Sequence, residues 1–185
     1  MARRDSEEID IAELLNEIRN DPKYKTFKRI ITTAQERLST LERDRKEIFA
    51  LNSTRLSRKL YTGKKYSPSA VMEASACDMS ARTRLVELRT RTSFHMGTIE
   101  KAMEAFQDHV QTEYKEELRE YSTEAQRKSF IRRTQQIANS IVVDGKDLLD
   151  LCDRVIDDID KASYQLSNMT KLIEKLSQSI GGKVV

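Results

Sequence analysis

The sequence predicts an all-α fold, with long antiparallel helices in an elongated helical bundle and a C-terminal heptad (coiled-coil-like) helix. Charged residues make up 34% of the 185-residue chain, which has five glycines, two prolines and no tryptophan. This composition is typical of long helices. No alternation of polar and apolar residues persists long enough to indicate a strand. Residues 148–180, in contrast, carry apolar side chains at alternating spacings of four and three.

This alternation forms a heptad seam, the pattern with which one helix packs lengthwise against others. At 1.5 Å per residue, the helix would be roughly 50 Å long. Further apolar residues widen its face, so it packs either between helices of its own chain or into an oligomer of more than two strands. We favour a homo-oligomer. The ten seam residues are Leu148, Cys152, Val155, Ile159, Ala162, Leu166, Met169, Ile173, Leu176 and Ile180.

Three helices are expected before Ser122. Residues 8–19 have an amphipathic pattern that ends at Pro22, and they form either a packing arm or a detachable helix. A second helix is expected over residues 23–61. A third is expected over residues 68–121, because Ser67 is a suitable cap and proline is favoured at the first helical position.

Two helices are expected after Ser122. Thr123 and Gln126 have the spacing of a capping box, which predicts a helix start. Asp144 and Gly145 indicate a break or bend before the seam helix, with one continuous helix as the alternative.

Charge is segregated along the chain. Residues 1–22 carry three basic and seven acidic side chains, whereas residues 23–65 carry thirteen basic and four acidic ones. We therefore divide the chain into an N-terminal acidic helical arm (1–22), a basic long-helix hairpin (23–121) and C-terminal helices with the oligomerisation seam (122–185). Such blocks are arguments about partners rather than about fold.

The basic block is the best functional signal in the sequence. Single-stranded nucleic acid is held by cations that follow its phosphates and by aromatic rings on which bases stack. Residues 43–66 offer both, and the arginines of residues 82–91 extend the track. An ordinary solvated helix face is the alternative interpretation. The candidate binding residues are Arg43, Arg45, Lys46, Arg55, Arg58, Lys59, Tyr61, Lys64, Lys65, Tyr66, Arg82, Arg84, Arg89 and Arg91.

No catalytic, cofactor or metal motif is present in the sequence, so we expect a protein that is not an enzyme and needs no cofactor or metal. His95 and His109 would lie about 21 Å apart on one helix, too far to share a metal. The carboxylates of residues 150–160 are expected on a solvated outer face, or docked on a basic surface. No apolar stretch could span a bilayer or act as a signal peptide, which predicts a cytoplasmic protein that does not bind membranes.

Residues 36–110 resemble the recombination mediators of T4-type phages, which are small helical ring-forming proteins. The shared features are a basic helix over Glu42–Lys59, the turn Tyr61-Thr62-Gly63-Lys64-Lys65 and a helix through Met79–Leu88. The resemblance implies a phage-encoded protein that binds single-stranded DNA through Lys59, Lys64 and Lys65 and loads a recombinase. It also implies ring assembly through the C-terminal helices.

Together these observations predict a non-enzymatic, oligomeric nucleic-acid-binding accessory protein. The alternative is a helical scaffolding or packaging protein, similar to a small terminase subunit, whose charge blocks serve contacts between proteins.

Overall fold

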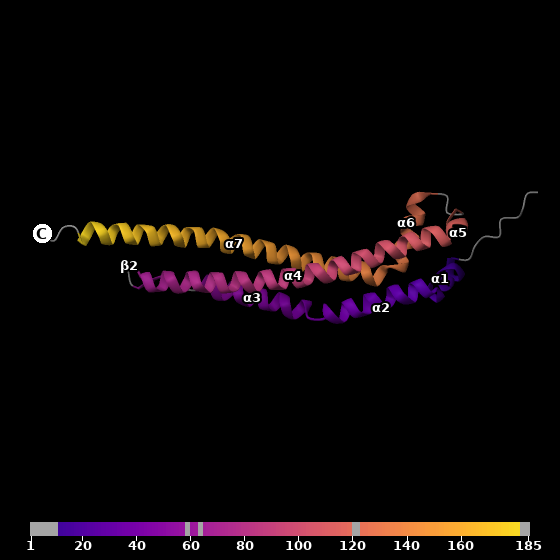
Figure 1. The fold of residues 1–185 in the computed structure, drawn as a ribbon, viewed down its shortest axis with the longest axis horizontal. Coiled ribbons are helices and arrows are strands. Elements are labelled where there is room, and N and C mark those ends of the chain that lie inside the picture. The colour runs from indigo at the N-terminus through magenta and orange to yellow at the C-terminus, as the bar shows by residue number, and fades with distance from the viewer. Residues whose placement is uncertain (1–10, 58–59, 63–64, 120–122, 182–185) are drawn as a thin grey trace, which may run out of the picture. The chain divides into compact units, whose positions relative to one another are not determined.

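The computed structural model describes residues 11–57, 60–62, 65–119 and 123–181, and it confirms the predicted all-α fold (Figure 1). The one strand pair in these ranges is a two-residue hairpin at the predicted turn, where Tyr61 pairs with Tyr66. The elements are α1 (Ile11–Asn20), α2 (Pro22–Arg37), α3 (Leu41–Ser57), β1 (Tyr61–Thr62), β2 (Lys65–Tyr66), α4 (Pro68–Glu113), α5 (Lys115–Arg119), α6 (Glu124–Thr134) and α7 (Gln136–Gly181).

The chain forms two compact units, and each combines two separate stretches of sequence. Unit 1 contains residues 1–39 and 94–145, and unit 2 contains residues 40–93 and 146–185. The three segments that the charge blocks suggested (1–22, 23–121 and 122–185), in contrast, follow one another along the sequence. The two divisions differ because α4 and α7 each run through both units: α4 is divided near its middle, whereas only residues 136–145 of α7 belong to unit 1.

Unit 2 is built from α3, the first half of α4 and most of α7, which lie side by side (Figure 1). Arg82 pairs with Asp160 and Arg89 with Asp153, so α4 and α7 run antiparallel, as predicted. The hydrophobic core between the three helices contains Ile48, Ala81, Leu85, Leu88, Leu148, Cys152, Val155 and Ile159.

The predicted seam is used inside the chain over its first half. Leu148, Cys152, Val155, Ile159 and Leu166 are buried within the protein itself, which is the first of the two alternatives given for the seam. Ala162, Met169 and Ile173 are half-buried, and Leu176 is 60% exposed. The side chain of Ile180 lies outside the described part of the structure.

The seam loses its partners because its neighbours end before it does. The α3 helix stops at Ser57. From the Arg82–Asp160 pair, fourteen residues back along α4 reach its first residue, Pro68, and fourteen residues forward along α7 reach Glu174. Leu176 therefore lies beyond the start of α4, in a stretch of α7 that has neither α3 nor α4 beside it.

Unit 1 contains α1, α2, the second half of α4, α5, α6 and the start of α7. The rings of Phe27 in α2 and Phe106 in α4 stack with their centroids 4.7 Å apart. The other buried apolar residues of this unit include Leu14, Ile18, Ile31, Ala34, Ile99, Val110, Leu118, Phe130, Ile131 and Ala138.

Several predicted helix boundaries are wrong. The expected helix over residues 68–121 is interrupted at Tyr114, between α4 and α5, and Tyr61, the expected end of the second helix, lies in β1. The expected helix over residues 23–61 is interrupted between Arg37 and Leu41, where the Ser39 hydroxyl donates to the carbonyl of Glu36 at 2.6 Å. Such side-chain bonds compete with the helical pattern. The expected break at Gly145 is absent, and the interruption lies at Gln135, whose side-chain amide donates to the carbonyl of Met103 at 2.6 Å.

Candidate nucleic-acid interface

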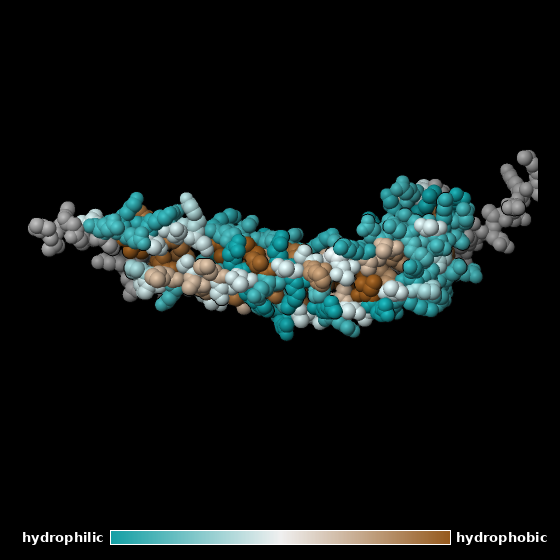
Figure 2. All heavy atoms as spheres, viewed as in Figure 1, coloured by the Kyte–Doolittle hydropathy of each residue, from teal (hydrophilic) through white to brown (hydrophobic). Residues whose placement is uncertain are grey.

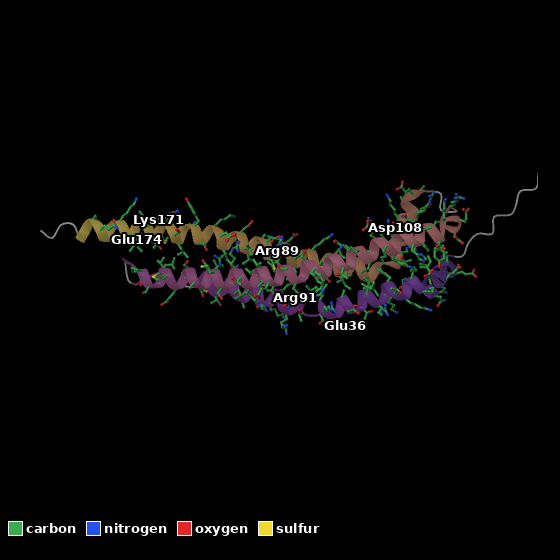
Figure 3. All side chains as sticks on the ribbon, in the orientation of Figure 1. Glu36, Arg89, Arg91, Asp108, Lys171 and Glu174 are labelled. Carbon is green, nitrogen blue, oxygen red and sulfur yellow. The ribbon has the colours of Figure 1, made fainter. Side chains whose placement is uncertain are left out.

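Four arginines of the predicted basic track form ion pairs between helices of unit 2. On α4, Arg82 contacts Asp160 of α7 at 2.7 Å and Arg89 contacts Asp153 of α7 at 2.5 Å. On the other flank of α4, Arg84 contacts Glu47 of α3 at 2.6 Å and Arg91 contacts Asp44 of α3 at 2.5 Å. Figure 3 labels Arg89 and Arg91 among the side chains between these helices.

Three of these ion pairs shift the pKa of at least one partner in the direction that favours its charged form. The hydrogen bond from Arg84, which outweighs the effect of burial, lowers the pKa of Glu47, and the charges of Arg84, Arg43 and Arg91 lower it further. The hydrogen bonds to Asp160 and Asp153 raise the pKa values of Arg82 and Arg89, respectively. A phosphate would have to compete with a carboxylate for each of these arginines, and their role in binding stays a prediction.

Three of the four remaining described cations of the predicted track also contact residues of their own chain. Arg45 is 4.0 Å from Asp147, and Lys46 is 3.6 Å from Glu42. Arg55 is only 6% exposed, and its Nη2 donates to Asn52 at 3.1 Å. Arg43 is exposed, close enough to Glu47 to affect its pKa.

The basic turn lies largely outside the described residues. Arg58, Lys59 and Lys64 are in the ranges that the structure does not describe. Tyr61, Lys65 and Tyr66 have a described backbone in β1 and β2, but their side chains are not described. Their role in binding stays a prediction.

Two carboxylates of the predicted outer face of α7 (residues 150–160) are partners of arginines on α4. Asp153 and Asp160 are half-exposed and contact Arg89 and Arg82, so these two carboxylates are docked on a basic surface of their own chain. Within the described residues, no group of three or more His, Cys, Asp or Glu side chains is placed to hold a metal ion. None of the described helices has a segment of the length and apolarity that a bilayer crossing requires.

The α2 helix of unit 1 presents a different kind of basic surface. Its 16 residues contain five cations and a single acidic residue, Glu36. Among the described residues, no carboxylate forms an ion pair with any of these cations. The five are Lys23, Lys25, Lys28, Arg29 and Arg37.

A hollow lined by cations lies on each flank of α2. The larger one, which we call the Lys28 hollow, has a volume of about 590 Å³, and Arg19, Lys25, Lys28 and Arg133 are among its lining residues. The smaller one, the Arg29 hollow, has a volume of about 260 Å³. Its lining residues are Arg29, Ile30, Thr33, Ala34, Arg37, His95 and Thr98. Neither lining contains a carboxylate, so both hollows favour negatively charged ligands.

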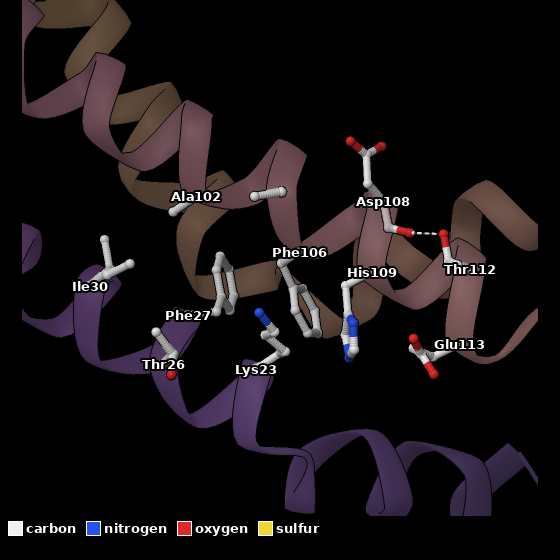
Figure 4. Close-up of a pocket in the computed structure, with 11 residues that line it drawn as sticks. Lys23, Thr26, Phe27, Ile30, Ala102, Phe106, Asp108, His109, Thr112 and Glu113 are labelled. Atoms are coloured by element: carbon white, nitrogen blue, oxygen red, sulfur yellow. Dashed lines mark hydrogen bonds between the residues drawn. The ribbon is translucent and has the colours of Figure 1, made fainter.

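A third hollow, between α2 and α4, differs in charge. It has a volume of about 490 Å³, and Lys23 and His109 share its lining with Asp108 and Glu113 (Figure 4). The backbone carbonyl of Asp108 accepts a hydrogen bond from Thr112 at 2.8 Å. Because its two carboxylates outnumber Lys23, the one lysine or arginine in its lining, this hollow has no preference for anions.

Asp21 fixes the position of α2 within unit 1. It caps the helix by accepting a hydrogen bond from the backbone N–H of Lys23. Its Oδ2 atom lies 2.9 Å from His109 Nε2 and accepts a hydrogen bond from the Tyr114 hydroxyl at 3.2 Å. Burial, followed by the charge and hydrogen bond of Asp21, raises the pKa of Tyr114 to about 12. The cationic face of α2 is therefore attached to α4 by a buried polar cluster.

The sequence interpretation did not single out the cations of α2. They belong to the same thirteen-to-four block of residues 23–65. A separate count for this helix, five basic residues against one acidic, would have identified them. Arg133 could not be found in this way, because it joins the Lys28 hollow from a distant part of the sequence. Comparison of the chain with protein-family models, with curated proteins and with solved structures gives no match.

Proposed function

We propose that the protein is a non-enzymatic nucleic-acid-binding accessory protein whose interface centres on α2. The observation that carries this proposal is the contrast between the two units. Apart from the exposed Arg43, the described arginines of unit 2 that were predicted to bind are engaged by the chain's own residues, whereas the five cations of α2 form no ion pair with a described carboxylate. Unpaired cations along one helix are the electrostatic pattern of a phosphate-binding surface.

Nucleic acid fits this surface better than a membrane does. A helix that lies on a membrane needs large apolar side chains exposed beside its cations. The exposed large apolar residues of the described chain include none from α2. Phosphates along a strand, in contrast, need only cations at intervals, together with polar groups such as Thr33 and Gln35 between them.

The test compares two double variants that change the net charge equally. Arg29→Glu with Arg37→Glu removes two cations of the Arg29 hollow. The control, Lys171→Glu with Lys175→Glu, changes exposed lysines of α7, of which Figure 3 labels Lys171. We expect the first variant to bind a fluorescent oligo-dT strand at least about tenfold more weakly, and the control to bind it nearly as the unchanged protein does.

Two outcomes would contradict the proposal. The first is an unchanged protein that does not bind the strand at low salt. The second is an equal loss in both variants, which would indicate an effect of net charge alone. A third variant, with Lys59, Lys64 and Lys65 changed to Glu, tests the turn that resembles the phage mediators. An unchanged affinity there would restrict the interface to α2.

A second candidate is a scaffolding protein that assembles through α7. Leu172 and Leu176 are each 60% exposed, and they lie where α7 extends towards and beyond the start of α4. A second copy of this chain could cover them, because Leu176 continues the heptad spacing of the seam and Leu172 widens its apolar face. The particle masses of the unchanged protein and of the variant Leu172→Asp with Leu176→Asp test this candidate. It predicts that the unchanged protein forms an assembly and that the variant does not.

A further inference from the structure

The Lys28 hollow combines an apolar floor with a cationic rim. Residues from the end of α1 and from α2 form one side, and residues 133–138, where α6 meets α7, form the other. All of them belong to unit 1. The complete lining is Arg19, Tyr24, Lys25, Phe27, Lys28, Ile31, Thr32, Gln35, Arg133, Thr134, Gln135, Gln136, Ile137 and Ala138.

The floor is rigid and partly aromatic. Phe27, Ile31 and Ala138 are buried in the core of unit 1. The ring of Tyr24 is half-buried, and its centroid lies 6.2 Å from that of Phe27 and 5.5 Å from that of Phe106. A ring fixed by two neighbours offers a prepared surface for a flat ligand, at little cost in side-chain entropy.

The rim consists of four cations from three helices. Arg19 ends α1, Lys25 and Lys28 lie on α2, and Arg133 lies near the end of α6. All four are exposed, and none forms an ion pair with a described carboxylate. Gln135 holds the α6–α7 junction in place through its bond to Met103, which positions Arg133 across from α2. An anion at the rim would therefore meet positive charge on both sides.

We infer that the Lys28 hollow binds a nucleoside phosphate. The base lies against the apolar floor beside Tyr24, and the phosphate lies among the cations of the rim. The volume of about 590 Å³ falls within the range of small-ligand pockets. Gln35 and Gln136 offer amide groups to the edge of a base.

Two sources present this chemistry: a free nucleotide and one nucleotide unit of a single strand. The inference goes beyond the proposed function, because a free nucleotide would fit even if the protein bound no polymer. It also uses a different flank of α2 from the Arg29 and Arg37 variant.

The first experiment is calorimetric titration of the full chain with ADP, adenosine and inorganic pyrophosphate. If both the floor and the rim contribute, ADP binds at least about tenfold more tightly than either of the other two probes. Pyrophosphate that binds as well as ADP would overturn the role of the floor. Failure of ADP to bind would overturn the inference as a whole.

Matched variants then locate the site. Lys28→Gln with Arg133→Gln is expected to weaken ADP binding about tenfold, because charge-assisted hydrogen bonds to phosphate are lost. The control, Arg29→Gln with Arg37→Gln, makes the same charge change on the opposite flank and is expected to leave ADP binding unchanged. Unchanged ADP binding in the first variant would overturn the assignment.

Two substitutions of Tyr24 test whether its ring contributes to binding of the base. Tyr24→Leu is expected to reduce the preference for ADP over pyrophosphate, whereas Tyr24→Phe keeps the ring and retains the preference. Because Tyr24 contacts the core, thermal unfolding of both variants verifies that they fold. A preference that survives in a folded Tyr24→Leu protein would overturn the stacking role.

Oligo-dT distinguishes the two sources. If ADP displaces the strand and the Lys28 and Arg133 variant weakens strand binding, the hollow receives nucleotide units of the strand. If neither occurs while ADP still binds, the ligand is a free nucleotide. Loss of strand binding in the Arg29 and Arg37 variant alone concerns the proposed function and leaves this site unaffected.

Discussion

Gly145 lies where α7 passes close to α4 in unit 1. A Cβ atom at this position would overlap Met96 Sδ and lie 3.0 Å from Met96 Cγ. Met96 is itself only 3% exposed, so its flexible side chain can move aside only by repacking within the core. We expect Gly145→Ala to lower the free energy of unfolding by about 1–3 kcal/mol, the usual cost of overpacking a core. Urea unfolding followed by far-UV circular dichroism measures this loss.

Gly97 is the matched control for this substitution. It also lies within a helix of unit 1, but a Cβ atom there would have no neighbour within 4 Å. Gly97→Ala is therefore expected to raise the free energy of unfolding by about 0.5–1 kcal/mol, because alanine favours the helix. Changes of the same sign in the two variants would contradict the close approach at Met96.

Asp21 makes the attachment of α2 dependent on pH. Burial raises its pKa, but the bonds from His109, from the backbone of Lys23 and from Tyr114 together place it below the usual 3.8. A carboxyl group whose pKa is lower in the folded state stabilises the protein above its unfolded-state pKa. This stabilisation is lost as pH falls through the folded-state value.

Asp21→Asn tests this contribution, because asparagine still caps a helix but carries no charge. At neutral pH we expect a loss of about 1–2 kcal/mol, typical of hydrogen bonds to a charged group. The difference between the two proteins should shrink below about pH 4. Urea unfolding across this pH range measures it, with Asp108→Asn, an exposed carboxylate of α4, as the control. A difference that stays constant with pH would refute the role of the charge.

At the scale of elements, the ion pairs that join α4 to its neighbours differ in how far the carboxylate partner is exposed. Asp44 is 2% exposed, and its Oδ1 atom has no described hydrogen-bond partner. Arg91→Met would leave this carboxylate buried without a counter-charge, and we expect a loss of about 3–5 kcal/mol. Arg89 and Asp153 are both about half exposed, so Arg89→Met should cost less than about 1 kcal/mol. Thermal unfolding of the two variants gives the comparison, and equal losses would contradict it.

The heptad spacing of residues 148–180 predicts the helix α7 and its inward face. It does not predict which helix covers that face, because the same spacing serves contacts within a chain and between chains. The start of α4 at Pro68 limits the part of α7 that has α4 beside it, and so determines how much of this apolar face is covered within the chain. The apolar pattern also does not predict the gap between α2 and α3, because it continues through this point. The gap coincides with hydrogen bonds from the Ser39 hydroxyl to the carbonyl of Glu36 and from the Thr40 hydroxyl to Asp44.

At the scale of the whole molecule, the charge blocks predicted a basic surface but not its location. The partner of Arg82 lies 78 residues away along the chain, so a local count cannot show that this arginine is paired. The same count includes α2, whose cations have no such partners among the described residues. Composition thus identifies a nucleic-acid interface as a hypothesis, and only the tertiary pairing indicates which cations remain available for it.

The division into two units predicts how a shortened chain behaves. A chain of residues 1–145 keeps both stretches of unit 1 but lacks the part of α7 that completes unit 2. Without Leu148, Cys152 and Ile159, the core residues of α3 and of the first half of α4 would face water, a loss far larger than a single core substitution. We expect hydrogen exchange to show lost protection in α3 and retained protection in α2.

A chain of residues 1–174 is the control, because it keeps every buried residue of that core. It should retain protection in both helices, since the segment removed lies beyond the start of α4. If α2 lost protection together with α3 in the shorter chain, the two units would fold as one cooperative body. If α3 kept its protection there, its burial would depend on α4 alone.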